Sequence, residues 1–366
     1  MKFKILRSEF LDALQITQSV VERKNVMPIL SNILIEADNK KQNITIIATD
    51  LEVAVNLSLQ AEVQTSGKIT VSAKSLFEIV KESAGQDILV SKSENERVQI
   101  ISNQSEYKIM GLPCEEFPAL PEVKGTFAKI SSAGLVKLFD NVSFAMSSDE
   151  TRYHLNGILI EKNPDGAVMV ATDGHRLAYT QGALDISGMQ QDKVILPKKG
   201  VYELKKFCEK AKEIDLCISD HHVLAQTEGF LLFIRIIDGN FPDYNRVIPS
   251  VNPVVIEIPR QSLLGALKRV SLLVNDRSKG VSLYFCNNSL TISSSDPEVG
   301  EAKEDIDITY SGAVFTIGFN AFFFIDVLNV IEDECVKIAF KDALSPCLIT
   351  CDSNPGFKSV VMPMRR

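Results

Sequence analysis

A repeat with a period of about 123 residues constrains the fold of this chain more than any other feature. Three stretches that resemble one another carry it: Ile47–Ala54, Val170–Ala178 and Ser293–Gly300. Each is a strand-like run with a Thr-Asp or Ser-Asp turn, and the aspartates Asp50, Asp173 and Asp296 are spaced by 123 residues twice. One third of 366 residues is 122. Because self-similarity at a fixed period indicates repeated structural units, we expect three copies of one unit.

Helix patterns keep the same period. Each third begins with a short apolar run and an amphipathic helix pattern, at Ser8–Leu14, Ala133–Phe139 and Gln261–Leu267. A second helix pattern follows a later strand, near Ala73–Phe77, Pro197–Val201 and Gly318–Phe322. A Phe-Pro turn recurs at Phe117 and Phe241, 124 residues apart. We therefore predict an α+β chain of three similar domains, each with two helices and about eight strands, at residues 1–122, 127–249 and 252–366.

Composition and charge exclude several classes of protein. Hydrophobic residues make up 45% of the chain and charged residues 23%, which is typical of a globular protein and too apolar for a disordered one. With 39 Lys+Arg against 47 Asp+Glu, the net charge of −8 excludes a uniformly basic, DNA-coating protein but not a local basic surface. No apolar run approaches the ~18 residues of a membrane span, and the N-terminus has no signal-peptide core. We expect a cytoplasmic protein with no membrane partner.

Common catalytic and metal-binding motifs are missing from the sequence. It has no GxxxxGK[ST], GxGxxG, HExxH or GxSxG motif. The seven cysteines form no CxxC pair and are not spaced with the four histidines as zinc ligands, so we predict reduced thiols, no metal and no cofactor. The repeated aspartates are better explained as turn residues than as a metal cluster.

Two other functions stay open at this point. Asp173-Gly174-His175-Arg176 is a conceivable acid–base centre of a repeated α+β enzyme, although the sequence supplies neither a partner for His175 nor a cleft. Such an enzyme would lose turnover on His175→Ala. The second alternative is a general protein-interaction scaffold.

Several motifs resemble those of one known family over the whole chain. They are Met1-Lys2-Phe3, Thr172–Ala178, Asp238–Pro249, Tyr310–Gly312, Gly318–Asn320, Asp326–Asn329 and Val360–Arg365. Together they resemble the bacterial DNA sliding clamps, the beta subunits of the replicative DNA polymerase III. The resemblance implies three similar domains per chain and two chains joined head to tail into a closed ring of six domains. Strands would form the outer scaffold and twelve helices would line the hole.

The resemblance also implies a mechanism and a set of partners. The ring would be a non-catalytic processivity factor that encircles double-stranded DNA without reading it and tethers the polymerase. Implied partners are a second copy of the chain, the polymerase III alpha subunit, the clamp-loader delta subunit, and other polymerases and repair proteins that carry clamp-binding motifs. Because topology would hold the ring on DNA, only a few mobile, sequence-independent phosphate contacts are needed.

Three surfaces follow from the resemblance. The DNA-facing surface is expected to include Lys24, Tyr153, His154, Lys198, Lys199, Arg277 and Lys279; further cations on the helices and adjoining turns are Arg23, Lys74, Lys137, Lys205, Lys206, Lys268 and Arg269. A pocket for a partner's peptide is expected between the second and third domains, at Leu155, Thr172, Gly174, His175, Arg176, Leu177, Pro242, Arg246, Val247, Val360 and Met362. A neighbouring groove would use Arg152, His154, Asn320, Phe323, Leu344, Pro346, Pro363, Met364 and Arg365.

The pocket residues suit a short linear motif. Leucine, valine and methionine make an adaptable apolar hole for a partner's Leu or Phe, and Arg152, Arg176, Arg246 and Asn320 are expected at its polar rim. The third surface, the joint between two chains, is expected to oppose Glu298, Glu301 and Glu304 to Lys74, Arg97, Tyr107 and Lys108, with Leu272 and Leu273 at its apolar centre.

Four positions depart from the commoner family pattern. His154 stands where an aromatic residue is frequent, and Asp149 stands near a loop that in other members carries an uncharged DNA contact. Phe323 replaces a tyrosine, and Pro346 replaces a small polar residue. These departures affect the expected peptide preference and the expected DNA contacts, not the implied function.

Overall fold

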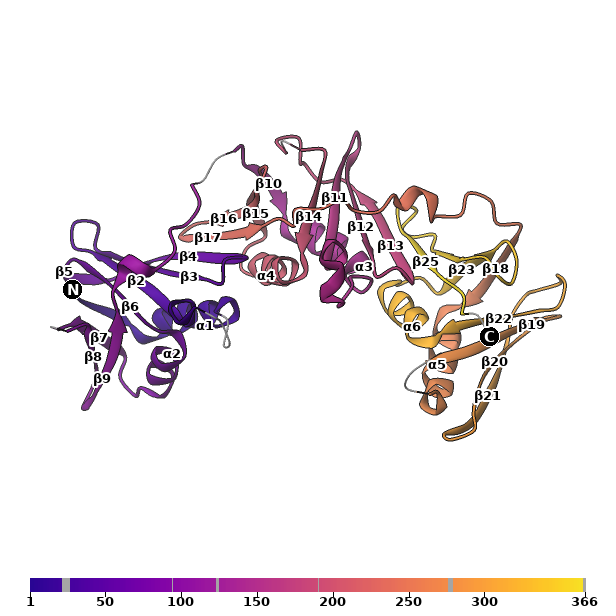
Figure 1. Cartoon of the computed structure of the whole chain (residues 1–366), viewed down its shortest axis with the longest axis horizontal. Coiled ribbons are helices and arrows are strands. Elements are labelled where there is room, and N and C mark those ends of the chain that lie inside the picture. The colour runs from indigo at the N-terminus through magenta and orange to yellow at the C-terminus, as the bar shows by residue number, and fades with distance from the viewer. Residues whose placement is uncertain (22–26, 94, 123–124, 190, 276–278, 365–366) are drawn as a thin grey trace. The chain divides into compact units, whose positions relative to one another are not determined.

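The computed structural model describes residues 1–366 except 22–26, 94, 123–124, 190, 276–278 and 365–366 (Figure 1). Of the expected site residues, Arg23, Lys24, Arg277 and Arg365 lie outside the described residues.

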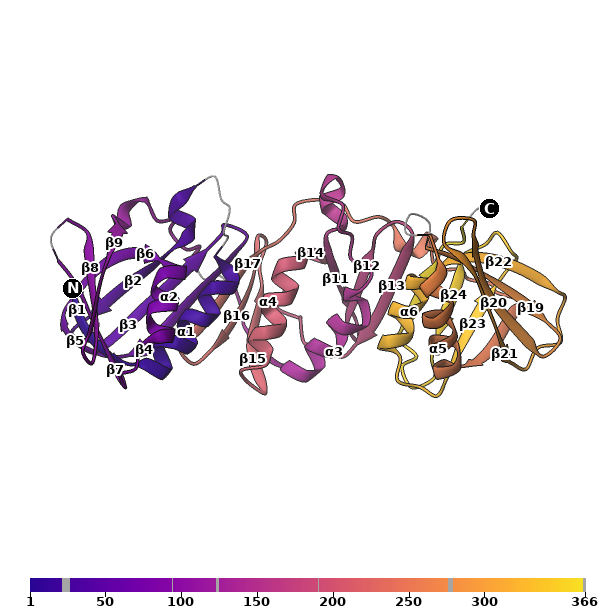
Figure 2. The same ribbon diagram turned by 90° about the horizontal axis from the view of Figure 1, so that it is seen from below.

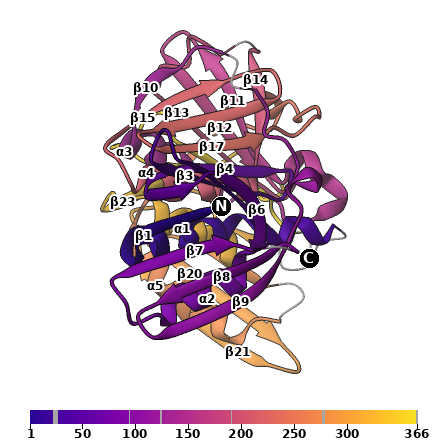
Figure 3. The same cartoon turned by 90° about the vertical axis from the view of Figure 1, so that its left-hand side faces the viewer.

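The first third contains two helices, α1 (Arg7–Val20) and α2 (Ala73–Glu82), and a short 3-10 helix at Pro28–Ser31 and another at Cys114–Glu116. Its strands are β1 (Lys2–Leu6), β2 (Asn32–Asp38), β3 (Asn43–Thr49), β4 (Val53–Gln60), β5 (Glu62–Thr65), β6 (Gly67–Ser72), β7 (Asp87–Lys92), β8 (Arg97–Ser102) and β9 (Ser105–Leu112). Strands β7, β8 and β9 are neighbours in the sheet and face the viewer in Figure 3.

The second third repeats this order with α3 (Ser132–Ser143) and α4 (Lys198–Cys208), and 3-10 turns at Glu150–Leu155 and Tyr244–Arg246. Its strands are β10 (Ala128–Ser131), β11 (Gly157–Asn163), β12 (Gly166–Thr172), β13 (Arg176–Gly182), β14 (Lys193–Pro197), β15 (Glu213–Ile218), β16 (His222–Thr227) and β17 (Phe230–Arg235).

The last third has α5 (Arg260–Val270), a 3-10 turn at Ser271–Leu273, and α6 (Ala321–Val330). Its strands are β18 (Val254–Pro259), β19 (Gly280–Cys286), β20 (Ser289–Asp296), β21 (Gly300–Asp307), β22 (Phe315–Asn320), β23 (Cys335–Phe340), β24 (Cys347–Thr350) and β25 (Lys358–Val361). The prediction of an α+β chain with two helices and about eight strands in each third is confirmed.

Residue contacts group the chain into two units, each with continuous antiparallel sheets. In the first unit (residues 1–133, 185–191 and 199–236) one sheet runs β10-β15-β16-β17-β4-β3-β2-β6-β9-β8-β7-β1-β5. In the second unit (residues 134–184, 192–198 and 237–366) one sheet runs β14-β11-β12-β13-β25-β24-β23-β18 and a smaller one runs β21-β20-β19-β22. Because the grouping follows these sheets, it divides the middle third, and the domain boundaries at 1–122, 127–249 and 252–366 stay predictions.

Strands from successive thirds therefore pair directly at two places, which we call the first and second joints. At the first joint β4 pairs with β17, and Val53 lies opposite Ile234. At the second joint β13 pairs with β25, and Arg176 lies opposite Val361. Antiparallel pairing satisfies the backbone groups that an edge strand would otherwise expose.

Helices cover the sheets in pairs. Figure 2 shows α1 beside α2, and α5 beside α6, each pair on one face of its strands. Their apolar positions are buried: Phe10 and Leu14 in α1 and Leu263 and Leu267 in α5 are almost fully enclosed. Burying such side chains is the main favourable term in forming each unit.

The repeated aspartates are turn residues, as predicted. The Oδ1 atom of Asp50 accepts the backbone N–H groups of residues 52 and 53, and the Oδ1 atom of Asp173 accepts those of residues 175 and 176. The Oδ1 atom of Asp296 accepts those of residues 298 and 299. A short side chain that accepts amides two and three residues ahead closes a tight turn between two strands, which explains why the sequence repeats Asp there.

Candidate functional site

The candidate site is built on the second joint. Leu177 in β13 lies opposite Val360 in β25, and both belong to a buried apolar cluster with Tyr244. Val247 packs against the same cluster and is only partly buried. Phe241 and Ile248 pack there too. The structure thus brings three expected pocket residues, Leu177, Val247 and Val360, together. It adds Tyr244, Phe241 and Ile248, which lie in the Asp238–Pro249 motif but were not predicted as pocket residues.

The turn before β13 forms one side of the site. Thr172 is buried, and its hydroxyl donates to the Arg176 carbonyl (2.6 Å) and accepts the Gly174 amide (3.1 Å). Gly174 has φ +88°, and a Cβ there would lie 2.8 Å from an Arg152 guanidinium nitrogen. The turn therefore needs glycine for its backbone conformation and for close approach, and it presents the exposed His175 side chain.

This turn does not form an acid–base centre. Asp173 accepts two backbone amides with one oxygen and the Arg176 Nε atom with the other (3.1 Å). Asp173 is the carboxylate of this motif, and because its two oxygens hold the turn and Arg176, it does not orient His175 as a general base.

The C-terminal segment forms the opposite side. After β25, the Met362 amide donates to the His175 carbonyl (2.9 Å) and the Met364 amide donates to the Gly318 carbonyl (2.8 Å). Met362 keeps much of its side chain exposed beside the Leu177–Val360 pair. Backbone bonds thus fix the segment while its methionine remains open to solvent, the arrangement expected of an adaptable apolar wall.

Arg176 is not a free rim residue, contrary to our expectation. Its guanidinium donates to Asp173, to Asp326 of α6 (2.5 Å) and to the Phe144 carbonyl beyond α3 (2.5 Å). Its Cζ atom lies 4.6 Å from the Phe323 ring centre and 5.4 Å from that of Phe144. Only 11% of the side chain is exposed. These contacts use each of the three guanidinium nitrogens and place two aromatic rings beside the planar cation, so Arg176 links the turn, α6 and the segment after α3.

The other expected rim residues differ in how far they are engaged. Arg246 is 85% exposed and pairs with Asp243 of its own turn (3.0 Å). Arg152 pairs with Asp149 (3.0 Å). Asn320 begins α6 by accepting the Phe322 amide with its side chain (3.0 Å). Leu344 and Pro242 are exposed, Pro346, Pro363 and His154 are partly buried, and Leu155 is buried in the core.

Asp149, one of the departures from the family pattern, begins the 3-10 turn at Glu150–Leu155. Its pKa is held below the usual range because its carboxylate accepts the hydroxyl and the amide of Thr151 and the Nε atom of Arg152. Its negative charge is therefore matched locally by Arg152.

The cations expected to face DNA are of two kinds. Lys198, the first residue of α4, donates to the Ser148 hydroxyl (3.0 Å), and the exposed Lys279 lies 5.1 Å from the Phe322 ring centre. Lys199 instead donates to the Val20 carbonyl (2.9 Å) and contacts the buried carboxylate of Asp50. Tyr153 is exposed and packs edge-on against His154 (5.7 Å between ring centres). Lys199 therefore has a structural role that its position in the sequence did not indicate.

Residues expected at the joint between two chains lie on separate edges. In the first unit Lys74 is the second residue of α2 and is exposed, Arg97 is exposed at the start of β8, and Tyr107 is partly buried in β9. In the second unit Leu272 is 78% exposed, and Glu298 and Glu301 are exposed beside the edge strand β21. Leu273 is partly buried. Glu304 accepts two bonds from Arg269 (2.5 and 2.8 Å), and this pair lowers the pKa of Glu304.

The structure also bears on metal binding and on membrane crossing. The described residues contain no group of three or more His, Cys, Asp or Glu side chains that could hold a metal ion. Across the part of the chain that the structure describes, no helix has the length and apolar composition to cross a membrane.

Comparison with known proteins gives one consistent result. Family models for the N-terminal, central and C-terminal domains of the DNA polymerase III beta subunit match residues 1–121, 129–243 and 245–365. The beta sliding clamp of Pseudomonas aeruginosa is 36% identical over 369 residues, covering 100% of both chains, and that of Caulobacter vibrioides is 35% identical over 379 residues with the same coverage.

Solved structures agree with the sequence comparisons. A beta sliding clamp of C. crescentus superposes with a TM-score of 0.95 at 34% identity, covering 100% of this chain and 99% of that one. A DNA polymerase sliding clamp of Bacillus subtilis superposes with a TM-score of 0.94 at 27% identity, with the same coverage.

Proposed function

Because this chain belongs to the DNA polymerase III beta subunit family, the bacterial sliding clamps, we propose that two copies close into a ring around duplex DNA and tether the polymerase to it. The family consists of non-catalytic processivity factors, so the chain serves DNA replication as a clamp. We also propose which residues form the joint between the two chains, the pocket for partner peptides and the DNA-facing surface. The observation that carries it is the repeated strand joint.

Two strand joints inside the chain predict a third one between chains. In the first two thirds, β4 and β13 each follow the repeated aspartate turn, and each pairs with the last strand of the next third. The corresponding strand of the last third, β21, lies at the edge of its sheet. The last long strand of the first third, β9, pairs with β6 only at Gly111 and Leu112. A head-to-tail dimer would pair β21 of one chain with β9 of the other and leave neither edge open.

The facing of side chains and the pairing of charges favour one register for this joint. Residues directly opposite each other share one face of a sheet, and Ala302 and Tyr107 both lie on the buried side, opposite Ser294 and Ile100. Pairing Ala302 with Tyr107 sets Glu301 against Lys108 and Lys303 against Glu106. A shift of two residues would instead set Lys303 against Lys108, or Glu301 against Glu106. Charge complementarity therefore supports the first register.

The same proposal gives the second joint its role as a docking platform. The Leu177–Val360 pair, with Val247 and Met362 beside it, would take an apolar side chain of a partner's peptide. Arg246, Arg152 and Asn320 lie nearer the surface and would meet the peptide's polar groups. The proposed ligands are the clamp-binding motifs of the polymerase III alpha subunit, the clamp-loader delta subunit, and other polymerases and repair proteins.

The DNA-facing role is assigned to the cations that keep their charge accessible. Apart from Lys199, the described members of the expected set are Lys198, Tyr153, His154 and Lys279; Tyr153 and Lys279 are exposed, and Lys198 and His154 are partly buried. A few such contacts to phosphates would be sequence-independent and weakened by salt. Retention on DNA would come from the closed ring, not from these contacts.

Retention on DNA tests the proposal. Labelled protein is loaded onto nicked circular plasmid with a clamp loader, and the plasmid is then cut once. A sliding ring leaves the linear product and stays on the intact circle, whereas a scaffold or an ordinary surface binder is retained equally on both.

A charge exchange tests the joint. Lys108→Glu should weaken the dimer, and adding Glu301→Lys in the same chain should restore it, measured by analytical ultracentrifugation at decreasing concentration. Glu62→Lys, on β5 and four strands from β9 in the sheet, is the matched control. Failure of the double variant to recover would contradict the register.

A further inference from the structure

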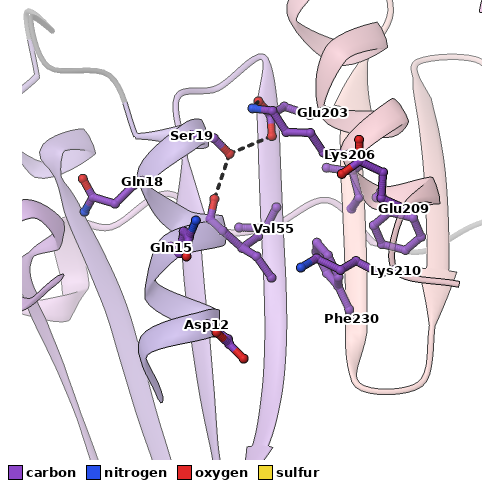
Figure 4. A pocket seen from close by; sticks show the side chains of 13 residues that line it. Asp12, Gln15, Gln18, Ser19, Val55, Glu203, Lys206, Glu209, Lys210 and Phe230 are labelled. Atoms are coloured by element: carbon purple, nitrogen blue, oxygen red, sulfur yellow. Dashed lines mark hydrogen bonds and ion pairs between the residues drawn. The ribbon is translucent and has the colours of Figure 1, made fainter. Parts of the chain in front are cut away.

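A cavity of about 460 Å³ lies at the first joint, between α1 and α4 (Figure 4). Its apolar wall is formed by Ile16, Val55, Phe207, Phe230 and Leu232, and its polar rim by Asp12, Gln15, Gln18, Ser19, Glu203, Lys206, Glu209 and Lys210. The rings of Phe207 and Phe230 lie 4.5 Å apart. The size and the mixture of aromatic and polar lining are typical of a small-ligand site.

A carboxylate at this cavity is the feature that points to a ligand. Glu203 is only 8% exposed. Its Oε2 atom accepts the Ser19 hydroxyl (2.7 Å), as Figure 4 shows, and its Oε1 atom accepts the Lys206 ammonium (2.8 Å). The Lys206 side chain is itself 56% exposed. A buried charge is costly without a well-ordered partner, and here one of the two partners is a long side chain held mostly in water.

The second joint indicates which ligand fits. Glu203 is the sixth residue of α4, and Asp326 is the sixth residue of α6, the corresponding helix. At the second joint the acid is met by the Arg176 guanidinium (2.5 Å), which also packs against the Phe323 ring (4.6 Å). At the first joint the strand position of Arg176 is occupied by Val53. The acid is therefore repeated and aromatic rings lie at both joints, although at different positions, but the guanidinium is present only at the second joint.

We propose that the cavity between α1 and α4 binds a guanidinium or amidinium cation carried on a small apolar body. The planar cation would displace Lys206 from the Oε1 atom of Glu203 and donate to that carboxylate. Its apolar body would pack against Phe207 and Phe230, where a cation near an aromatic face gains further attraction. Asp12 and Glu209 at the rim would attract it, and Lys206 and Lys210 would oppose it.

Calorimetry on the full-length protein with phenylguanidine as the probe tests this site. Phenylurea has the same shape without the charge, and we expect it to bind at least about ten-fold more weakly, because a hydrogen bond to a charged group is stronger than a neutral one. Glu203→Gln should weaken phenylguanidine binding by a similar factor. Glu209→Gln makes the same charge change at the rim, where no direct contact is proposed, and should alter the affinity by less than about three-fold.

A second variant keeps the test decisive if Glu203→Gln does not fold, which thermal unfolding would reveal. Lys206→Met removes the competing ammonium from an exposed side chain and should tighten phenylguanidine binding. Equal affinities for phenylguanidine and phenylurea would overturn the proposal. So would an affinity for phenylguanidine that Lys206→Met leaves unchanged or lowers. N-acetyl-arginine methylamide distinguishes a peptide arginine from a free aryl cation. If phenylguanidine or N-acetyl-arginine methylamide binds and the binding depends on Glu203, the proposed site is supported. If neither compound binds, the proposal is overturned.

Discussion

At each joint a cation links the turn aspartate to the neighbouring helices, but the cation is an arginine at one joint and a lysine at the other. At the second joint, Arg176 extends from strand β13 to the turn aspartate Asp173, to a carbonyl after α3 and to Asp326 of α6. At the first joint, Lys199 extends from helix α4 to the turn aspartate Asp50 and to a carbonyl at the end of α1. The lysine thus makes two of the three contacts that the arginine makes.

The missing third contact explains the different character of the joints. A guanidinium is planar and has five donors, so one Arg can link three elements at once, whereas an ammonium is a compact charge on a flexible stem. At the first joint the carboxylate of Glu203 in α4 accepts hydrogen bonds from Ser19 and Lys206, and a cavity lies beside it. At the second joint the arginine lies beside the proposed peptide pocket and ties Phe323 and the Thr172–Arg176 turn to the helices. Similar backbones therefore give a first joint with a cavity and a second joint with the buried Arg176 side chain at its centre.

The largest expected effect is that of Arg176→Ala. It would leave a partly buried carboxylate and a carbonyl without their donor, so we expect the free energy of unfolding to fall by about 3 kcal/mol. Arg176→Lys should recover only part of this loss. Chemical denaturation measures the change, and Arg246→Ala, on an exposed side chain of the same unit, is the control. A loss below about 1 kcal/mol would mean that the arginine does not hold the second joint.

Lys199→Met should have a smaller effect at the first joint, a loss of about 1–2 kcal/mol, because it breaks two contacts and leaves the Asp50 carboxylate, 6% exposed, without its cation. Lys198→Met is the matched control, since Lys198 is the neighbouring residue and its ammonium donates to the Ser148 hydroxyl. Comparing the two variants also distinguishes a structural role of Lys199 from a role in DNA binding. If Lys199→Met instead lowered the salt dependence of DNA association without any loss of stability, Lys199 would be a DNA contact and not a joint residue.

Alkaline pH should weaken the second joint selectively. Burial, followed by the hydrogen bond to Glu161, raises the pKa of Tyr244, which packs with Leu177 and Val360. A tyrosine whose pKa is raised by folding contributes stability that is full below the unfolded pKa of about 10 and is lost as pH rises through the folded value. We expect hydrogen exchange in β13 and β25 to accelerate above pH 10 more than in β4 and β17. Tyr244→Phe should remove that excess.

The smallest expected effect concerns the turns that precede the two joint strands. Gly174 and Leu51 occupy the same position after the turn aspartate, with φ of +88° and +77°. A non-glycine residue in this region is strained, and Leu51 is half exposed, so little burial would be lost on its replacement. We expect Leu51→Gly to raise the free energy of unfolding by up to about 1 kcal/mol. Gly174→Ala should lower it, and equal signs for the two changes would contradict this interpretation.

Local patterns in the sequence predicted much of the fold and part of the site. The repeated aspartates, the helix patterns and the strand alternation depend on neighbours a few residues apart, and the structure has them where expected. Leu177, Val247 and Val360 were named from family motifs and do share one cluster. Arg176 and Lys199 were also named, but their partners Asp326 and Asp50 lie 150 and 149 residues away in the chain. No local pattern reports which distant acid a cation meets.

The sequence by itself determined the three-fold repeat, the fold class and the family, because periodicity and turn chemistry are local properties that survive without knowledge of the packing. The tertiary structure alone decided that Arg176 is a buried link and not a rim residue, that Lys199 holds the first joint, and that Glu203 lies beside a cavity. These roles depend on which side chains meet across paired strands and packed helices. That choice is set by burial and by the geometry of donors and acceptors in three dimensions.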